Sequence, residues 1–162
     1  MNIRVLTKYA LLIAVCAIGG QIHLWGSISF DSSPAFVGAL VLGPAAGAIL
    51  GALGHLAAAT YSGFPLGPAV HGVVALIMAC TAGMVGVTFH KMTSSFSYVV
   101  SGIVGYIINV WIGLAITALM MGSTEVIGPM WGPLSLGYVW NYVLAALVVS
   151  QLNRVFGGTK HE

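Results

Sequence analysis

Long apolar runs separated by short clusters of turn-forming residues occupy most of the chain. The runs lie at residues 3–20, 34–60, 69–89, 96–121 and 134–156, and they are rich in Ala, Leu, Gly and Ile. A strand of a membrane barrel would instead alternate apolar and polar residues over about ten positions. A helix needs about 20 mostly apolar residues to span a bilayer. The pattern therefore predicts an all-α integral membrane protein.

The second run contains Gly43-Pro44, a pair that readily ends one helix and begins another. This run is therefore either one kinked span or two helices. Lys and Arg favour the cytoplasmic side of a membrane. A turn at Gly43-Pro44 places every basic residue on the cytoplasmic side and leaves Asp31 and Glu125 outside. A single kinked span would instead place three basic residues outside. The basic residues are Arg4, Lys8, Lys91, Arg154 and Lys160.

Charge placement thus predicts a six-transmembrane-helix bundle with both termini cytoplasmic, built as a single domain over residues 1–162. Residues 34–42 are too few to cross a bilayer at about 1.5 Å per residue, so the second helix must be short or tilted. Clusters of Gly, Pro, Ser and Asp mark the main connections. The predicted helices are about 3–20, 33–42, 44–60, 69–89, 96–121 and 134–156.

The first 20 residues have a basic start and an apolar core, as a signal peptide does. Lipoprotein processing needs a small residue before the cysteine, but Val15 precedes Cys16. No small-x-small cleavage site precedes a soluble domain either. We therefore interpret this segment as the first membrane helix.

The composition supports a membrane location, because 59% of the residues are hydrophobic and only 5% are charged. A soluble domain with this composition would lack the polar side chains to cover its surface. The two cysteines, Cys16 and Cys80, lie inside apolar runs and have no partner at zinc-site spacing. We expect them to be buried thiols, and we expect no metal site.

Polar side chains within the predicted spans gather at one depth, toward the outside. They come from four helices and are His55, His71, Asn109, Tyr138 and Asn141. Polar groups in hydrocarbon are costly unless they face one another or a cavity, so their common depth predicts an outward-facing binding pocket. The connections above this pocket carry side chains that could close over a ligand, namely His23, Trp25, Asp31, Tyr61, Phe64 and Trp131.

Two simpler interpretations of these residues stay open at this point. Aromatic residues at the ends of spans often form an interfacial belt, which would account for Trp25 and Trp131. Asn and His within membrane helices also bridge neighbouring helices, each bond contributing about 0.6 kcal/mol. The binding pocket is favoured because the polar residues come from several helices and share one depth.

Several classes of function lack the residues they would need. No acidic residue lies within a span, which argues against an ion-coupled transporter. The chain has no glycine-lysine P-loop, so it does not itself hydrolyse ATP. It also has no paired carboxylates, metal motif or activated nucleophile, so we expect neither an enzyme nor a cofactor of its own.

The stretch FDSSPAFVGALVLGPAAGAILGALGHL, residues 30–56, and the ALLIA segment of the first helix point to a known family. With the small size and the six predicted helices, they resemble the substrate-binding S components of energy-coupling factor (ECF) vitamin transporters. S components of this kind typically carry an acidic residue and a proline before the second helix, then a glycine-proline turn, then a polar residue near the outer end of the third helix. Asp31, Pro34, Gly43-Pro44 and His55 occupy those places.

The resemblance implies which partner subunits the chain has and what each of them does. In this family an A-x-x-x-A motif on the first helix packs against the transmembrane coupling subunit, and Ala10 and Ala14 match that motif. Two ATP-binding subunits then drive substrate release, by tilting the S component in the membrane. Gly47 and Gly51 would provide a close-packing or sliding face for this motion.

The resemblance also implies a vitamin-like substrate and a bacterial cell membrane. Because the predicted pocket has aromatic, imidazole and amide groups and no charge within the membrane, a neutral aromatic molecule with hydroxyl groups fits it best. The sequence is most similar to the α-ribazole transporters of Firmicutes, which serve cobalamin salvage. Riboflavin, pyridoxine and hydroxymethylpyrimidine stay possible, as does a non-transporting membrane scaffold or assembly subunit.

Overall fold

The computed structural model describes residues 3–21, 23–25, 28–94 and 96–156. The described residues form six helical rods and one small β-hairpin. Three helical segments, α5, the π-helix η1 and α6, follow one another without a break and make one rod. The bounds are α1 (Ile3–Gly19), β1 (His23–Trp25), β2 (Ile28–Ser29), α2 (Ser33–Val41), α3 (Pro44–Ser62), α4 (Pro68–Lys91), α5 (Phe96–Tyr106), η1 (Ile107–Ile112), α6 (Gly113–Met121) and α7 (Ile127–Phe156).

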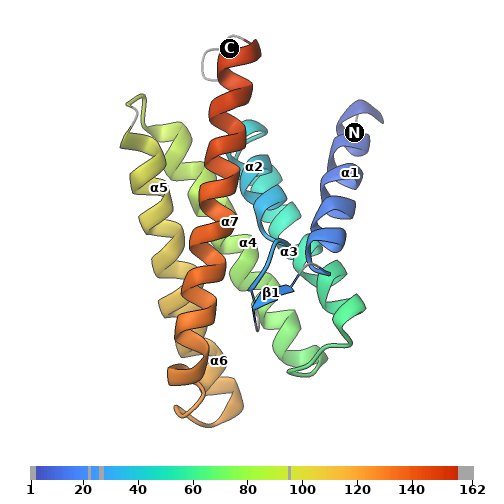
Figure 1. Cartoon of the computed structure of the whole chain (residues 1–162), viewed down its shortest axis with the longest axis vertical. Coiled ribbons are helices and arrows are strands. Elements are labelled where there is room, and N and C mark those ends of the chain that lie inside the picture. The colour runs from blue at the N-terminus through green and yellow to red at the C-terminus, as the bar shows by residue number, and fades with distance from the viewer. Residues whose placement is uncertain (1–2, 22, 26–27, 95, 157–162) are drawn as a thin grey trace.

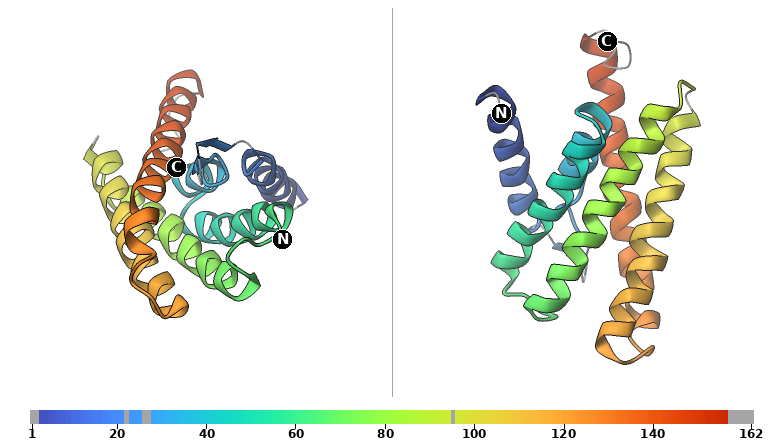
Figure 2. Two further views of the ribbon diagram at one scale, coloured as in Figure 1. Left: turned by 60° about the horizontal axis from the view of Figure 1, so that its bottom comes forward. Right: turned by 180° about the vertical axis from the view of Figure 1, so that it is seen from behind.

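The rods run up and down, and the start of α1 and the end of α7 lie at the same end of the bundle (Figure 1). We call this the terminal end and the opposite one the distal end. The turn between α2 and α3 also lies at the terminal end, while the connections from α3 to α4 and from α6 to α7 lie at the distal end. Figure 2 shows α1 at one edge of the bundle and the rod of α5 and α6 at the other.

Three of the rods are long and apolar enough to cross a membrane, and they are Pro68–Lys91, Phe96–Met121 and Ile127–Val155. Helix α1 contributes a shorter apolar segment, Leu6–Gly19. The predicted helical membrane protein is therefore confirmed, apart from the β-hairpin between α1 and α2. That hairpin pairs His23 with Ser29 and Trp25 with Ile28, and it falls in a segment that the sequence predicted to be a loop.

Helix α7 begins at Ile127, seven residues before the predicted start at 134. The sequence pattern predicts a start that is too late because two prolines precede residue 134, and prolines commonly end helices. Pro129 is the third residue of α7, within the first turn, where a backbone N–H has no helical partner to lose. Pro133 lies inside the helix and removes one backbone bond, a loss that membrane helices tolerate.

The short helix α2 lies in the middle of the bundle, in contact with α1, α3, α4 and α7. Most of its residues are buried, including Phe36 and Leu40 in the hydrophobic core. A helix that begins inside a protein must still satisfy its first N–H groups. The Ser32 side chain does not cap α2; instead the Asn141 carbonyl on α7 accepts the Ser33 N–H at 2.7 Å. At the other end, His90 Nε2 donates to the Ala39 carbonyl at 3.2 Å.

The glycines of α3 let this helix approach three neighbours closely. A Cβ atom at Gly47 would lie 2.5 Å from the Cβ of Ala39, and one at Gly51 would lie 2.5 Å from the backbone oxygen of Met78. One at Gly54 would lie 2.7 Å from the Cys16 sulfur. All three glycines are buried, so the predicted close packing is confirmed. A sliding face at Gly47 and Gly51 is wrong, because these positions face the inside of the bundle.

Gly51→Ala is expected to lower the free energy of unfolding by about 1–3 kcal/mol, since overpacking a tight crossing forces the backbones apart. The matched control is Gly72→Ala on α4, where an added Cβ would meet nothing within 4 Å. The control should be neutral or slightly stabilising, because Ala favours a helix over Gly. Unfolding titrations in mixed detergent micelles measure both. Equal stability of the two variants would mean that α3 and α4 do not cross this tightly.

Candidate functional site

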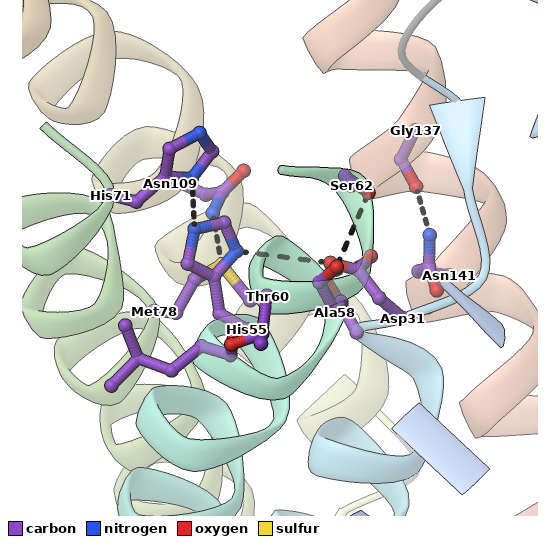
Figure 3. A network of polar contacts seen from close by, with 12 residues as sticks. Asp31, His55, Ala58, Thr60, Ser62, His71, Met78, Asn109, Gly137 and Asn141 are labelled. Atoms are coloured by element: carbon purple, nitrogen blue, oxygen red, sulfur yellow. Dashed lines mark hydrogen bonds and ion pairs between the residues drawn. The ribbon is translucent and has the colours of Figure 1, made fainter. Parts of the chain in front are cut away.

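Three polar side chains from separate segments meet in the distal half of the bundle. The carboxylate of Asp31, just before α2, lies 3.8 Å from Nδ1 of His55 on α3. Nε2 of His55 lies 3.2 Å from Nδ1 of His71, in the first turn of α4. The two imidazole rings stack, with their centroids 5.3 Å apart and their planes inclined by 23°. Figure 3 shows this chain of contacts from Asp31 to His71; we call it the polar relay.

The connection between α3 and α4 packs against His71 from the side opposite His55. The Leu66 N–H donates to Nε2 of His71 at 3.5 Å, and the Phe64 ring meets the imidazole edge to face at 5.6 Å. Phe64 has a φ of 51°, a conformation that costs energy for a residue other than glycine. Backbone strain of this kind clusters at functional sites, and here it holds an aromatic ring at the end of the relay.

Asn109 contributes a second polar position, deeper in the bundle. It lies in η1, and the residue is only 8% exposed. Its Nδ2 donates to the Met78 sulfur at 3.0 Å, and a thioether is a weak acceptor. Met78 lies two helical turns along α4 from His71, about 10 Å at 1.5 Å per residue. A π-helical turn in an otherwise regular helix is also frequent at functional sites.

The oxygen of the Asn109 amide has no hydrogen-bond partner among the described residues. Within that part of the chain, no fully buried side-chain nitrogen or oxygen is left without a partner. The amide oxygen therefore borders accessible space. Asn109 differs in this from Tyr138 and Asn141, whose polar groups bind neighbouring helices.

Tyr138 and Asn141 lie among the helix contacts around α7. The Tyr138 hydroxyl donates to the backbone oxygen of Gly102 at 2.9 Å, and its ring meets Phe36 edge to face at 5.4 Å. One turn on, the Tyr142 hydroxyl donates to the backbone oxygen of Tyr98 at 2.6 Å. Asn141 binds the start of α2, as described above. The structure thus places both predicted site residues in the packing of α7 against α2 and α5.

Three aromatic residues predicted to cover the site belong to three different elements, β1, α3 and α7. Tyr61, near the end of α3, is 73% exposed. Trp131, in the second turn of α7, is 45% exposed and lies against Trp111, with ring centroids 6.3 Å apart. Trp25 belongs to β1, but its side chain lies outside the described residues.

Among the described side chains, no group of three His, Cys, Asp or Glu residues is arranged to hold a metal ion. Cys16 is buried as predicted, but Cys80 is exposed, so the prediction of a buried thiol there is wrong.

Comparison with known proteins gives one match. Residues 4–156 match the family model described as ECF transporter, substrate-specific component. The chain belongs to this family. No curated protein and no solved structure matches it. Substrate-specific components are transporter subunits rather than enzymes, and the family implies a small-molecule substrate together with coupling and ATPase modules.

In this S component, Ala10 and Ala14 lie one turn apart on the exposed face of α1. Leu11 and Ile18 share that face and are also exposed. The row is apolar and contains small side chains, which allow another helix to approach closely. Because α1 stands at the edge of the bundle, this face is open to a partner in the membrane (Figure 2).

Sequence reasoning missed two groups at the site of this S component. The sequence predicts Phe64 only as one of the side chains that could close over a ligand, not its contact with His71, and it gives no sign of the Leu66 backbone contact. The signal available was the GFPLG segment, residues 63–67, whose two glycines both adopt positive φ and allow the tight path around His71. The partner of Asn109 was also missed, because a methionine carries no polar pattern.

Proposed function

We propose that this S component captures one neutral, ring-containing vitamin or cofactor precursor at the polar relay and Asn109. The observation that carries the proposal is the Asn109 amide, which is nearly buried and has one weak hydrogen bond. A buried amide left with so few partners costs free energy in the empty protein. A ligand group that binds it recovers that free energy, which is the expected behaviour of a binding site.

We assign the direct ligand contacts to Asp31, His55 and Asn109. Both ring nitrogens of His71 are already used, so we give this residue a positioning role. Tyr138 and Asn141 support the site by fixing α7 against its neighbours. The aromatic cover consists in this proposal of Trp25, Tyr61 and Trp131, together with the strained Phe64.

The proposed topology is a single six-transmembrane-helix domain over residues 1–162, with both termini in the cytoplasm of a bacterial cell. Support comes from the charges, because basic residues favour the cytoplasmic side. Lys8, Lys91 and Arg154 lie on helix segments at the terminal end, while Glu125 lies in the connection at the distal end. The Arg4 side chain and Lys160 lie outside the described residues. The distal end, with the polar relay, then faces outward.

The proposed partner surface is the exposed row of α1 that contains Ala10 and Ala14. The coupling subunit docks there, and two ATP-binding subunits supply the energy, so that the S component needs no cofactor of its own. The substrate we favour is α-ribazole, for cobalamin salvage, because its benzimidazole ring and ribose match a site with aromatic rings, an amide and a carboxylate. Riboflavin, pyridoxine and hydroxymethylpyrimidine are the alternatives.

The proposal predicts saturable binding of one of these four compounds, at about one molecule per chain, by the S component purified without its partners. Isothermal titration in detergent measures this directly for each compound. If none binds and none co-purifies, capture is rejected. The polar residues would then serve only to bridge helices, as in a membrane scaffold or assembly subunit.

A further inference from the structure

Each hydrogen bond of the polar relay is donated in the same direction along the chain of contacts, from Leu66 through His71 and His55 toward Asp31. The Leu66 N–H can only donate, so Nε2 of His71 accepts and carries no proton. A neutral His71 therefore has its proton on Nδ1, which donates to Nε2 of His55. The proton of His55 is then on Nδ1, the atom that faces Asp31.

The contact with Asp31 agrees with this arrangement, because a carboxylate accepts hydrogen bonds and the atom that faces it must be a donor. Nδ1 of His55 therefore presents an N–H toward Asp31.

The last contact of the relay is too long to be a direct hydrogen bond. Nδ1 of His55 and Oδ2 of Asp31 are 3.8 Å apart, while N–H···O bonds span about 2.7–3.2 Å. Polar groups at such a separation are commonly bridged by a third atom, placed off the line that joins them. The Ser32 hydroxyl donates to the other carboxylate oxygen, Oδ1, at 3.0 Å, which orients Oδ2 toward His55.

The bridging atom must accept a hydrogen bond from the His55 N–H and donate one to the Asp31 carboxylate. A hydroxyl does both, whereas a carbonyl or ether oxygen cannot donate and an ammonium cannot accept. We infer that a hydroxyl of the captured ligand bridges His55 and Asp31. This inference rests on the proposed function and sharpens it: the ligand carries a sugar, sugar-alcohol or hydroxymethyl group, and the bare ring system is a poor substrate.

The test compares two pairs of compounds that differ in the hydroxylated arm. One pair is α-ribazole and 5,6-dimethylbenzimidazole, and the other is riboflavin and lumichrome. For the pair that the wild-type S component binds, the hydroxylated member should bind about 10- to 100-fold more tightly, since a hydrogen bond to a charged group is lost with the arm. Equal binding of the two members would overturn the inference while leaving capture intact. If none of these compounds binds, and pyridoxine and hydroxymethylpyrimidine do not bind either, capture and the inference are rejected together.

Two substitutions at His55 separate the hydroxyl bridge from a merely structural role. The amide of His55→Asn can place an N–H where Nδ1 lies, so this variant should keep most of the preference for the hydroxylated compound. His55→Gln reaches instead toward His71 and should reduce the preference to about threefold or less. His90→Gln, which changes a histidine at the terminal end, is the control and should match the wild type. A preference that survives in His55→Gln would overturn the inference.

Discussion

Ala14→Trp is expected to abolish assembly of the S component with its coupling subunit while leaving ligand binding unchanged. Ala14 lies on the exposed face of α1, one turn from Ala10. An indole at this position would hold a docked helix several ångströms away, and close approach is what small residues provide in membranes. The polar relay is built by the segments from Asp31 to His71, none of which belongs to α1.

Co-purification with a tagged coupling subunit measures assembly, and ligand titration of the isolated S component measures binding. Ala115→Trp on α6 is the matched control, because Ala115 is also exposed but lies across the bundle from α1. The control should assemble normally. Normal assembly of Ala14→Trp would mean that α1 is not the docking face, and loss of ligand binding would mean that α1 supports the site instead.

Asn109→Leu is expected to weaken ligand binding by roughly 30- to 1,000-fold, which corresponds to about 2–4 kcal/mol for the loss of two hydrogen bonds. The same variant should be as stable as the wild type or more so. Leucine is similar in size, and the amide that it replaces has only a thioether as its partner. Weaker ligand binding together with equal or higher stability is characteristic of a binding residue whose side chain lowers the stability of the empty protein.

Asn141→Leu provides the contrast, because it removes the acceptor of the Ser33 N–H at the buried start of α2. That donor would be left unsatisfied, so we expect a loss of about 1–3 kcal/mol in the free energy of unfolding. Unfolding titrations and ligand titrations on both variants give the comparison. A destabilised Asn109→Leu protein with normal ligand affinity would identify Asn109 as a helix bridge and contradict its place in the site.

The helix pattern could be read from the sequence where local chemistry dictates it. Gly43 adopts a φ of 103°, which other residues rarely accept, and Pro44 begins α3. The turn between α2 and α3 was therefore predictable from two residues. The start of α7 was not, since prolines within the first turns of a helix look the same in sequence as prolines that end one.

The partners of the polar side chains could not be derived from sequence, because they depend on how helices cross. Spacings of three and four residues place Tyr138, Asn141, Tyr142 and Ala145 on one face of α7, and all four are buried. Their roles, however, depend on what lies opposite, which is the start of α2 and the backbone of α5. The α3 glycines show the same limit, because their spacing predicted a close-packing face but not that α3 buries it against α1, α2 and α4.

The central claim is that this chain alone captures one small molecule, and native mass spectrometry of the S component purified from its own host tests it most directly. We predict one ring-containing, hydroxylated compound per wild-type chain, released on denaturation, and none on the Asn109→Leu protein. A wild-type chain that carries no small molecule, and takes up none of the four candidate compounds, would contradict the account.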